Sequence, residues 1–389
     1  MKTCYADLHI HIGRTGSGRP VKITGARTLT IENILKEASD RKGMDIVGVI
    51  DCHVPEVLDD LERMAENGVV EPLADGGLRF SNAVLIPGVE IEVKDDRCLG
   101  PVHVLAYFPT LRDMRAFSGW LSRHVTNITL STQRFFGDAR TLQERVKSDG
   151  GLFIPAHVFT PFKSVYGSGV RRSLAEIFDT DLIDAIELGL SADTSMADQI
   201  EELHRYPFVS NSDAHSLAKI GREYQALRVD HPSFAELRAA LLGEGGRAIE
   251  ANYGLNPRLG KYHRTRCAVC LTPLVGESKD QRCPHCGQRR IVKGVSERLQ
   301  ELADAAGSRR ERPPYIHQVP LEFIPNVGPK TRDKLLEAFG TEMAVMHRAS
   351  IAALEGVVGA KTAALIAAAR EGRLAVEAGG AGRYGRVKT

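Results

Sequence analysis

Short apolar segments recur along residues 1–255, and stretches whose apolar positions have helical spacing lie between them. Buried strands of a parallel sheet form short apolar runs of this kind, so each segment predicts a strand. The predicted strands are Cys4–His11, Asp45–Ile50, Ala83–Val93, Pro101–Phe108, Gly151–His157, Leu182–Leu190 and Pro207–Ser210. Two intervening stretches, Ile31–Lys42 and Ser233–Leu242, are predicted amphipathic helices. This alternation predicts an α/β fold with a parallel sheet, either open or closed into a barrel.

The pattern changes after residue 255, which marks the predicted end of the first domain (1–255). Residues 256–293 contain two cysteine pairs, and residues 294–319 contain a predicted helix and a charged, proline-containing connector. Residues 320–372 are predicted to be helical, with an internal repeat formed by Val327–Thr331 and Val358–Thr362. Residues 373–389 are rich in glycine and arginine and are predicted to be a flexible basic tail.

Length and composition narrow the protein class. A chain of 389 residues suggests several domains, because a single core rarely grows beyond about 250–300 residues. The formal net charge of +2 does not indicate a nucleic-acid-binding protein, so such an inference must rest on local features. Four of the seven cysteines form two CxxC pairs, which favours a metal site in a reducing compartment over a disulfide framework. We expect a cytoplasmic protein, because neither a signal peptide nor a membrane-spanning run is visible.

Nearly every predicted strand ends with a residue that can bind metal. Active sites of α/β proteins collect where the strands end, so these side chains are expected to meet there. One histidine alone is more often a buried structural residue, but the repetition favours a shared metal centre. Imidazole and carboxylate groups suit Zn²⁺, Mn²⁺ or Fe²⁺, and the set exceeds one tetrahedral site, so two or three ions are expected. The candidates are His9, His11, Asp51, His53, Glu90, His103, His157, Asp193, Asp213 and His215.

These motifs resemble those of the PHP (polymerase and histidinol phosphatase) superfamily. The resemblance implies a distorted (βα)7 barrel with up to three metal ions, in this case Zn, Mn or Mg. It implies a first metal held by His9, His11, Glu90 and Asp213, a second by Glu90, His103 and His157, and a third by His53 and His215. The family usually has adjacent aspartate and histidine after the second strand, whereas Cys52 separates Asp51 from His53 here. Either residue is therefore a candidate ligand, and His53 is favoured.

Two aspartates have less certain roles. Asp7 precedes the two histidines of the first strand and is predicted to orient one of them. Asp193 is either a third-metal ligand or proton-transfer group, or the N-cap of a helix that begins at Thr194. Both are retained as candidate catalytic residues.

The cysteine pairs predict a structural zinc site. Four thiolates in two short pairs match a closed tetrahedral Zn²⁺ site, and a glycine after the second pair permits the tight turn there. Four unrelated thiols are the alternative. The predicted ligands are Cys267, Cys270, Cys283 and Cys286.

The repeat in residues 320–372 resembles a tandem helix-hairpin-helix element. The resemblance implies that glycine-containing turns expose backbone N–H groups to DNA phosphates, with a lysine nearby. The residues concerned are Gly328, Lys330, Gly359 and Lys361. The repeat is not a phosphate-binding P-loop, because Pro329 and Ala360 occupy the position that must be glycine. A structural helical bundle is the alternative.

The order of these units along the chain resembles the endonuclease Q family of archaea and some bacteria. The stretches Ile154–Phe162, Glu187–Asp193 and Asn211–His215 carry the closer resemblance. It implies a DNA repair endonuclease, acting on damaged double- or single-stranded DNA. The family cuts on the 5′ side of deaminated bases (uracil, hypoxanthine, xanthine) or abasic sites, leaving a 3′-hydroxyl and a 5′-phosphate.

Two other functions are compatible with parts of this pattern. A PHP-type phosphatase or 3′–5′ exonuclease would share the metal ligands but would not need the C-terminal units. A non-catalytic DNA-binding scaffold is disfavoured, because decay would remove ligands first.

Reading a damaged base requires a pocket with polar groups and a flat apolar wall. The loop after the fifth predicted strand provides such residues. The candidates for DNA contact there are Phe159, Lys163, Tyr166, Ser168, Arg171 and Arg172.

Overall fold

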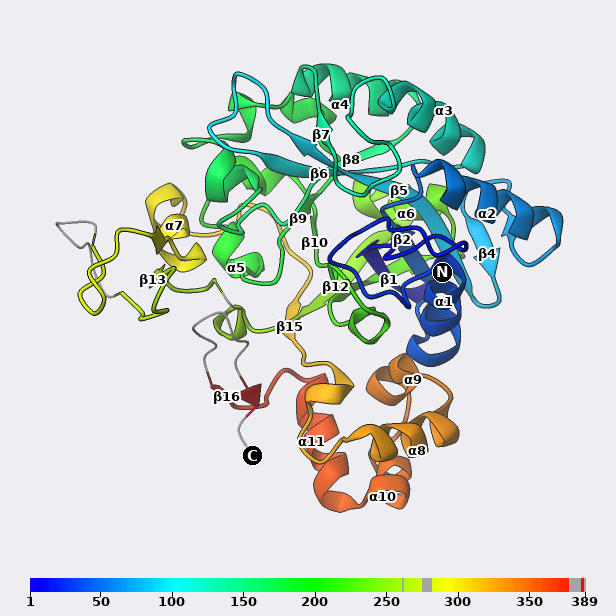
Figure 1. Cartoon of the computed structure of the whole chain (residues 1–389). Helices are drawn as coiled ribbons and strands as arrows, with labels where there is room; N and C mark the ends of the chain where they lie inside the picture. Colours follow the sequence, from blue (N-terminus) through cyan, green and yellow to red (C-terminus); the bar gives the residue numbers. More distant parts are fainter. Residues whose placement is uncertain (261, 275–281, 378–385, 388–389) are drawn as a thin grey trace.

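An eleven-stranded mixed sheet forms the framework of the chain (Figure 1). The structure is a computed structural model and describes residues 1–260, 262–274, 282–377 and 386–387. The central strands are β1 (Lys2–Ile10), β2 (Ile46–Val49), β5 (Ala83–Val93), β6 (Val102–Tyr107) and β8 (Leu152–Pro155). On the other side of β1 the sheet continues through β11 (Tyr224–Val229), β12 (Ala248–Gly254) and β15 (Tyr315–His317). Short strands at the edges are β3 (Glu71–Pro72), β4 (Leu78–Phe80) and β7 (Arg134–Phe135).

The prediction of a parallel sheet is wrong for one strand that contributes to the site. Strands β1, β2 and β5 are parallel, but β6 runs antiparallel to both β5 and β8. The connection between β5 and β6, residues 94–101, is too short for a parallel crossover, which requires a dozen or more residues. The reversal brings the beginning of β6, rather than its end, to the edge where β1, β2 and β5 end.

A second strand pair completes the enclosure around the inner core. Strands β9 (Ile186–Glu187) and β10 (Phe208–Val209) are parallel to each other. The Val158 N–H donates to the Glu187 carbonyl (3.0 Å), and a bridge between Ile10 and Ala214 links the segment after β10 to β1. Side chains from β1, β2, β5, β6, β8, β10 and β11 share one buried cluster, which Ala185 joins from the residue before β9. The (βα)7 arrangement of a PHP barrel remains a prediction.

Helices cover the outer face of these strands (Figure 1). The predicted helix Ile31–Lys42 is present as α1 (Ile31–Lys36), which widens into the π-helical turn η1 (Glu37–Lys42). The predicted helix Ser233–Leu242 is α6 (Phe234–Leu242), capped by the Ser233 hydroxyl. The other helices of this region are α2 (Pro55–Glu66), α3 (Leu111–Leu121), α4 (Ala139–Ser148) and α5 (Thr194–Ala197). Short helical turns are η2 (Val165–Gly169), η3 (Leu174–Glu176), η4 (Thr180–Leu182), η5 (Glu201–Arg205), η6 (Leu217–Lys219), η7 (Glu244–Gly246) and η8 (Pro257–Leu259).

Residues 294–319, expected to be a connector, pack against the main body of the fold. Helix α7 (Val295–Leu302) buries three apolar side chains in the same core cluster as the outer helices. The Arg298 guanidinium donates to the backbone carbonyls of Tyr166 (2.8 Å) and Arg171 (2.7 Å). Further along, β15 pairs with β12 as an additional strand. No helix in the described ranges is long and apolar enough to cross a membrane.

The C-terminal helices form a separate core. They are α8 (Pro329–Phe339), α9 (Glu342–His347), α10 (Ile351–Val358) and α11 (Ala360–Arg370), preceded by the turn η9 (Leu321–Phe323). Their buried cluster also includes Leu255 and Leu259 from the segment after β12. An almost buried ion pair between Lys42 and Glu342 (2.9 Å) joins α9 to η1. Short strand pairs are β13 (Arg266–Cys267) with β14 (Ile291–Val292), and β16 (Val376–Glu377) with β17 (Arg386–Val387). Most of the predicted flexible tail lies outside the described residues.

A buried carboxyl beside the segment that follows β12 predicts that the stability of the fold depends on pH. Glu223 is fully buried, accepts a hydrogen bond from the Leu255 N–H (2.8 Å), and has its pKa raised by burial to about 8. The unfolded chain releases this proton near pH 4.5 while the folded chain retains it, so the free energy of unfolding falls between about pH 4.5 and 8. Glu223→Gln stays neutral and keeps the acceptor, so its melting temperature should match the parent at pH 5 and exceed it by several degrees at pH 8. Melting curves that differ by the same amount at both pH values would contradict this account.

Candidate metal centre

An irregularity in β1 directs the two histidines of this strand toward one place. Cys4 and Leu8 belong to the inner core cluster, whereas Ile10 belongs to the outer one. Strict alternation would place Leu8 and Ile10 on the same face, but the pairing register with β2 shifts between Asp7 and Ile10. The shift turns His9 and His11 inward, where both are fully buried.

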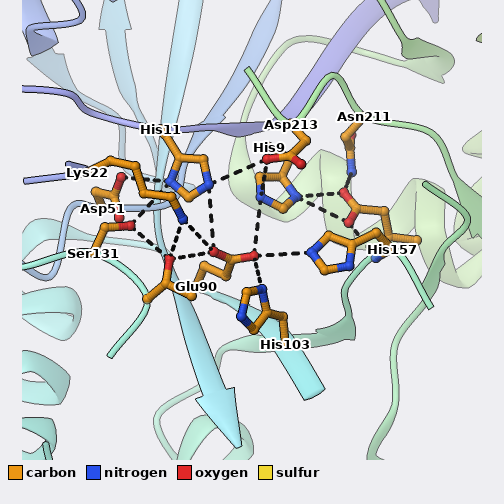
Figure 2. Close-up of polar contacts among 12 residues, drawn as sticks. His9, His11, Lys22, Asp51, Glu90, His103, Ser131, His157, Asn211 and Asp213 are labelled. Atoms are coloured by element: carbon orange, nitrogen blue, oxygen red, sulfur yellow. Dashed lines mark hydrogen bonds and ion pairs between the residues drawn. The ribbon is translucent and has the colours of Figure 1, made fainter. Parts of the chain in front are cut away.

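Glu90 lies at the centre of the side chains that meet at this edge (Figure 2). Its Oε1 atom is 3.7 Å from His9 Nε2, 2.8 Å from His103 Nδ1 and 3.4 Å from His157 Nε2. Its Oε2 atom is 3.6 Å from His11 Nε2. The Asp213 carboxylate lies 3.5 Å from the Nε2 atoms of both His9 and His11.

Three overlapping groups of potential metal ligands result. Within each group the ligand atoms lie within 4.8 Å of one another. The groups are His9, His11 and Glu90; Glu90, His103 and His157; and His11, Asp213 and His215. His103 reaches the site from the beginning of β6, as the antiparallel course of that strand requires. Every residue predicted for the first two metals is therefore at the same place.

The donor atoms fit metal ions. The Nε2 atoms of His9 and His11 are buried and have no hydrogen-bond partner among the described residues, although both face carboxylates. A divalent cation would satisfy both nitrogens and would neutralise the carboxylates. A cavity of about 650 Å³ adjoins the groups and is lined by His157, Asp213 and His215, among others. The arrangement therefore supports divalent metal ions.

The pKa values of the histidines and carboxylates in this site are shifted by the charges of their neighbours. Burial opposes the charged form of His9, but the carboxylates of Glu187 and Asp213 outweigh it and raise the pKa of His9 to about 10. Burial likewise opposes ionisation of Glu90, yet His103 and Lys22 hold the pKa of that carboxyl well below its usual range. The carboxylates thus remain ionised, as metal ligands must be.

Two residues at the site were missed by the sequence analysis. The Glu187 carboxylate accepts a hydrogen bond from His9 Nδ1 (2.9 Å) and is held by Asn211 Nδ2 (2.8 Å). The Lys22 ammonium lies 3.4 Å from Glu90 Oε2 and donates to the Thr132 hydroxyl (2.7 Å). Glu187 lies within the predicted strand Leu182–Leu190 and ends the shorter observed strand β9, so its place in a strand could have drawn attention to it. Lys22 lies in a loop with no distinguishing motif.

Glu187 should control the metal affinity of His9. A carboxylate on Nδ1 fixes the ring tautomer and makes Nε2 more basic, and loss of such a partner typically costs about 10–100-fold in affinity. We expect that loss for Glu187→Ala and a smaller one for Glu187→Gln, which keeps an acceptor oxygen. Competition titration against a coloured chelator measures both values. Wild-type affinity in both variants would show that Glu187 does not support the metal centre.

The four paired cysteines also come together. Cys267 Sγ lies 3.5 Å from Cys286 Sγ, and Cys270 Sγ lies 3.4 Å from Cys283 Sγ. Thiolates around a tetrahedral Zn²⁺ lie roughly 3.8 Å apart, given Zn–S bonds of about 2.3 Å. Gly287 has the positive φ (71°) that the tight turn after the second pair was predicted to need. The group fits a closed, structural zinc site.

Comparison with known proteins identifies the family. Residues 194–244 match the family model described as PHP-associated. The chain is 55% identical, over all of both chains, to the uncharacterized protein YqxK of Bacillus subtilis. All of it superposes on 95% of the lesion-specific endonuclease PfuEndoQ from Pyrococcus furiosus, with a TM-score of 0.85 and 34% identity. The chain belongs to the endonuclease Q family. It is therefore a metal-dependent endonuclease of the PHP superfamily.

A second solved structure of endonuclease Q is a complex with a DNA duplex. That protein holds a 27-mer duplex substrate with an abasic lesion at its active site. This chain superposes in full on 96% of that one, with a TM-score of 0.84 and 33% identity.

In this endonuclease Q chain, Asp51 rather than His53 lies next to a histidine of the site. The Asp51 carboxylate accepts a hydrogen bond from His11 Nδ1 (3.0 Å), and His11 holds the pKa of the buried Asp51 at about 2 against the effect of burial. His53 belongs to none of the three groups found in the described residues, and its Nε2 lies 3.3 Å from the Leu130 carbonyl. The geometry thus does not support His53 beside His215, and a role for His53 as ligand stays a prediction.

The structure shows what Asp7 and Asp193 contact, and it bears out the N-cap alternative for Asp193. Asp7 accepts hydrogen bonds from the backbone N–H groups of Ser212 (3.0 Å) and Gly221 (2.8 Å), so it holds loops rather than an imidazole ring. Asp193 is the N-cap of α5 and also contacts His317 Nε2 (3.0 Å). Neither belongs to the ligand groups of the described chain.

Two of the predicted DNA-contacting residues are buried. Phe159 and Tyr166 are almost fully buried and stack on each other with ring centroids 5.3 Å apart, so they belong to the core. Lys163, Arg171 and Arg172 are exposed, although Lys163 is paired with Glu92 (3.0 Å). Ser168 is partly buried and donates to the Pro101 carbonyl (3.3 Å).

The glycines and lysines of the C-terminal repeat are exposed. Gly328 and Gly359 directly precede α8 and α11, and Lys330 and Lys361 lie in the first turn of each helix. These four residues are therefore accessible to a ligand.

Proposed function

We propose that this chain is a DNA repair endonuclease that cuts the phosphodiester bond on the 5′ side of a deaminated base or an abasic site. The deaminated bases are uracil, hypoxanthine and xanthine, and the products carry a 3′-hydroxyl and a 5′-phosphate. The observation that carries the proposal is the meeting of seven potential metal ligands, with Glu90 among them, on a fold shared with a lesion-specific endonuclease.

The metal centre would hold two or three ions, Zn, Mn or Mg. His9, His11, Glu90 and Asp213 would hold one, and Glu90, His103 and His157 another, with Glu90 shared between them. His215 would contribute to a third. Bound together, such ions supply a nucleophile from water near neutral pH and neutralise the charge on the phosphate.

The chain's own residues would position the substrate. Glu187 and Asp51 hold the His9 and His11 rings, which fixes the direction of both Nε2 atoms. The adjoining cavity of about 650 Å³ is within the range of about 300–1,000 Å³ typical of ligand sites, so it can receive a nucleotide turned out of the helix. Arg222 lines this cavity and could attract the DNA backbone.

The domains proposed for DNA binding lie outside the barrel, which we assign to residues 1–255. We propose a zinc-binding module over 256–293 and a tandem helix-hairpin-helix over 320–372, joined by 294–319. In Figure 1, helices α8–α11 lie together below the sheet and beside α1. Exposed glycines at the helix starts would offer backbone N–H groups to phosphates, whatever the base sequence.

A panel of duplexes tests this function. Each duplex carries one internal uracil, hypoxanthine, xanthine or abasic site, with an undamaged duplex as the control. We expect a divalent-metal-dependent nick in the damaged strand and none in the undamaged duplex. Shortening from the ends of every duplex would favour a 3′–5′ exonuclease, and binding without cleavage in any metal would favour a scaffold.

A further inference from the structure

Two aromatic side chains stand exposed at the mouth of the metal cavity. Tyr262 lines the cavity together with Thr160 and His157. Phe162, from the same loop as Thr160, contacts Tyr262 edge to face, with ring centroids 5.7 Å apart and planes at 82°. Phe162 is 53% exposed and Tyr262 37% exposed. Exposed aromatic side chains beside a cavity are typical of a surface that a ligand covers.

The loop that carries Phe162 is held firmly on both sides. The Ser164 hydroxyl donates to the Thr160 carbonyl (2.5 Å), and the His103 N–H donates to the Lys163 carbonyl (2.9 Å). Lys163 is also paired with Glu92. Phe162 is thus fixed in an exposed position rather than placed on a loose loop.

Nearby rings show that burial was possible within this segment. Phe159 and Tyr166, on either side of Phe162 in the chain, are buried and stacked on each other. Burial of a phenylalanine side chain stabilises a fold, and this fold leaves about half of that stabilisation unused at Phe162. Tyr262 contacts Phe162 from a different segment of the chain. The Tyr262 carbonyl accepts a hydrogen bond from the Val295 N–H (2.9 Å) at the start of α7.

We propose that Phe162, supported by Tyr262, enters the base stack of the DNA duplex and fills the space left by the damaged nucleotide. This inference rests on the proposed function, because a nucleotide in the cavity must have left the helix. Removing a base from the stack costs free energy, and an aromatic ring that stacks on the remaining bases offsets part of that cost. Apolar side chains inserted between base steps act in this way in other DNA-binding proteins.

The proposal makes the contribution of Phe162 dependent on the substrate. A uracil paired in a duplex must be extracted, so the inserted Phe162 ring, which we call the wedge, promotes cleavage. The same uracil in a single strand has little stack to leave, so the wedge adds little. A purely structural role would affect both substrates alike.

Phe162→Ala tests this difference on one uracil-containing strand, used single-stranded and paired with its complement. We expect kcat/KM to fall about 10–100-fold on the duplex and less than about twofold on the single strand. Phe162→Trp should restore duplex cleavage. Leu242→Ala removes an exposed apolar side chain from α6, whose following loop lies beside Met1 at the start of β1, and serves as the control. Equal loss on both substrates, or no loss on either, overturns the proposal.

A binding measurement separates the wedge from the proposed function. With chelator present, 2-aminopurine next to the uracil should brighten when the parent protein binds the duplex, and should brighten much less with Phe162→Ala. If the parent protein cleaves no damaged substrate, the proposed function fails, yet this fluorescence still decides on the wedge. Equal brightening by parent and Phe162→Ala contradicts it.

Discussion

Glu90→Gln should abolish cleavage while leaving the fold intact. Glu90 is fully buried, and its two oxygens face the histidines at the end of β1, at the beginning of β6 and after β8. The amide has the same shape but lacks the charge that two metal ions would share. Because metal ions contribute several kcal/mol to stabilising the transition state, we expect kcat/KM to fall by at least about 10³-fold.

Metal content should fall with activity. Elemental analysis of the purified variant should show loss of the ions held by the barrel, while the zinc bound by the cysteines remains. Glu250→Gln is a suitable control, because Glu250 lies on β12, outside the ligand groups. Among the described residues, its side chain accepts a hydrogen bond from the Thr3 hydroxyl (2.8 Å). Glu90→Gln with parental activity and metal content would remove Glu90 from the centre of the site.

Reversing charge at the C-terminal repeat should weaken DNA binding strongly. Lys330 and Lys361 are exposed in the first turns of α8 and α11, where a phosphate could accept from backbone N–H groups and lysine together. In Lys330→Glu with Lys361→Glu, two attractive charges become repulsive. We expect Kd for duplex DNA to rise about 100-fold at 0.1 M salt, and the slope of log K against log salt to decrease by about 2.

A matched variant controls for net charge. Arg112→Glu with Arg238→Glu makes the same change of charge at exposed positions on α3 and α6, which belong to the main body of the fold. Fluorescence anisotropy across a salt series measures both quantities. Equal weakening in the two double variants would mean that only overall charge matters, and the helix-hairpin-helix assignment would then lose its support.

The sequence predicted which side chains meet at the site, because strand positions and residue spacing are local properties. The structure brings together residues chosen for lying within or just after an apolar run: His9, His11, Glu90, His103, His157, Asp213 and His215. The sequence did not reveal the shift in β1 that turns the histidines inward. It also did not reveal the antiparallel direction of β6, although the short 94–101 connection contained that information.

Other features depended on packing that no local pattern encodes. Glu187 supports His9 from another strand, and only the fold determines which carboxylate faces which ring. The sequence does not distinguish Phe159 and Tyr166 from Phe162, which lies between them in the chain. Phe159 and Tyr166 nevertheless stack on each other in the core, whereas Phe162 is exposed. Whether a loop aromatic is buried is decided by the space that the surrounding elements leave.

Mapping the nick on a duplex with a single internal uracil tests the central claim most directly. The damaged strand is labelled at either end in turn, and the protein is added with chelator, or with chelator followed by excess divalent metal. Our account predicts one nick at the phosphodiester bond 5′ to the uracil, absent with chelator and restored by metal, with a 3′-hydroxyl that a polymerase can extend. Cleavage that persists in chelator, or products that shorten progressively from the ends, would contradict it.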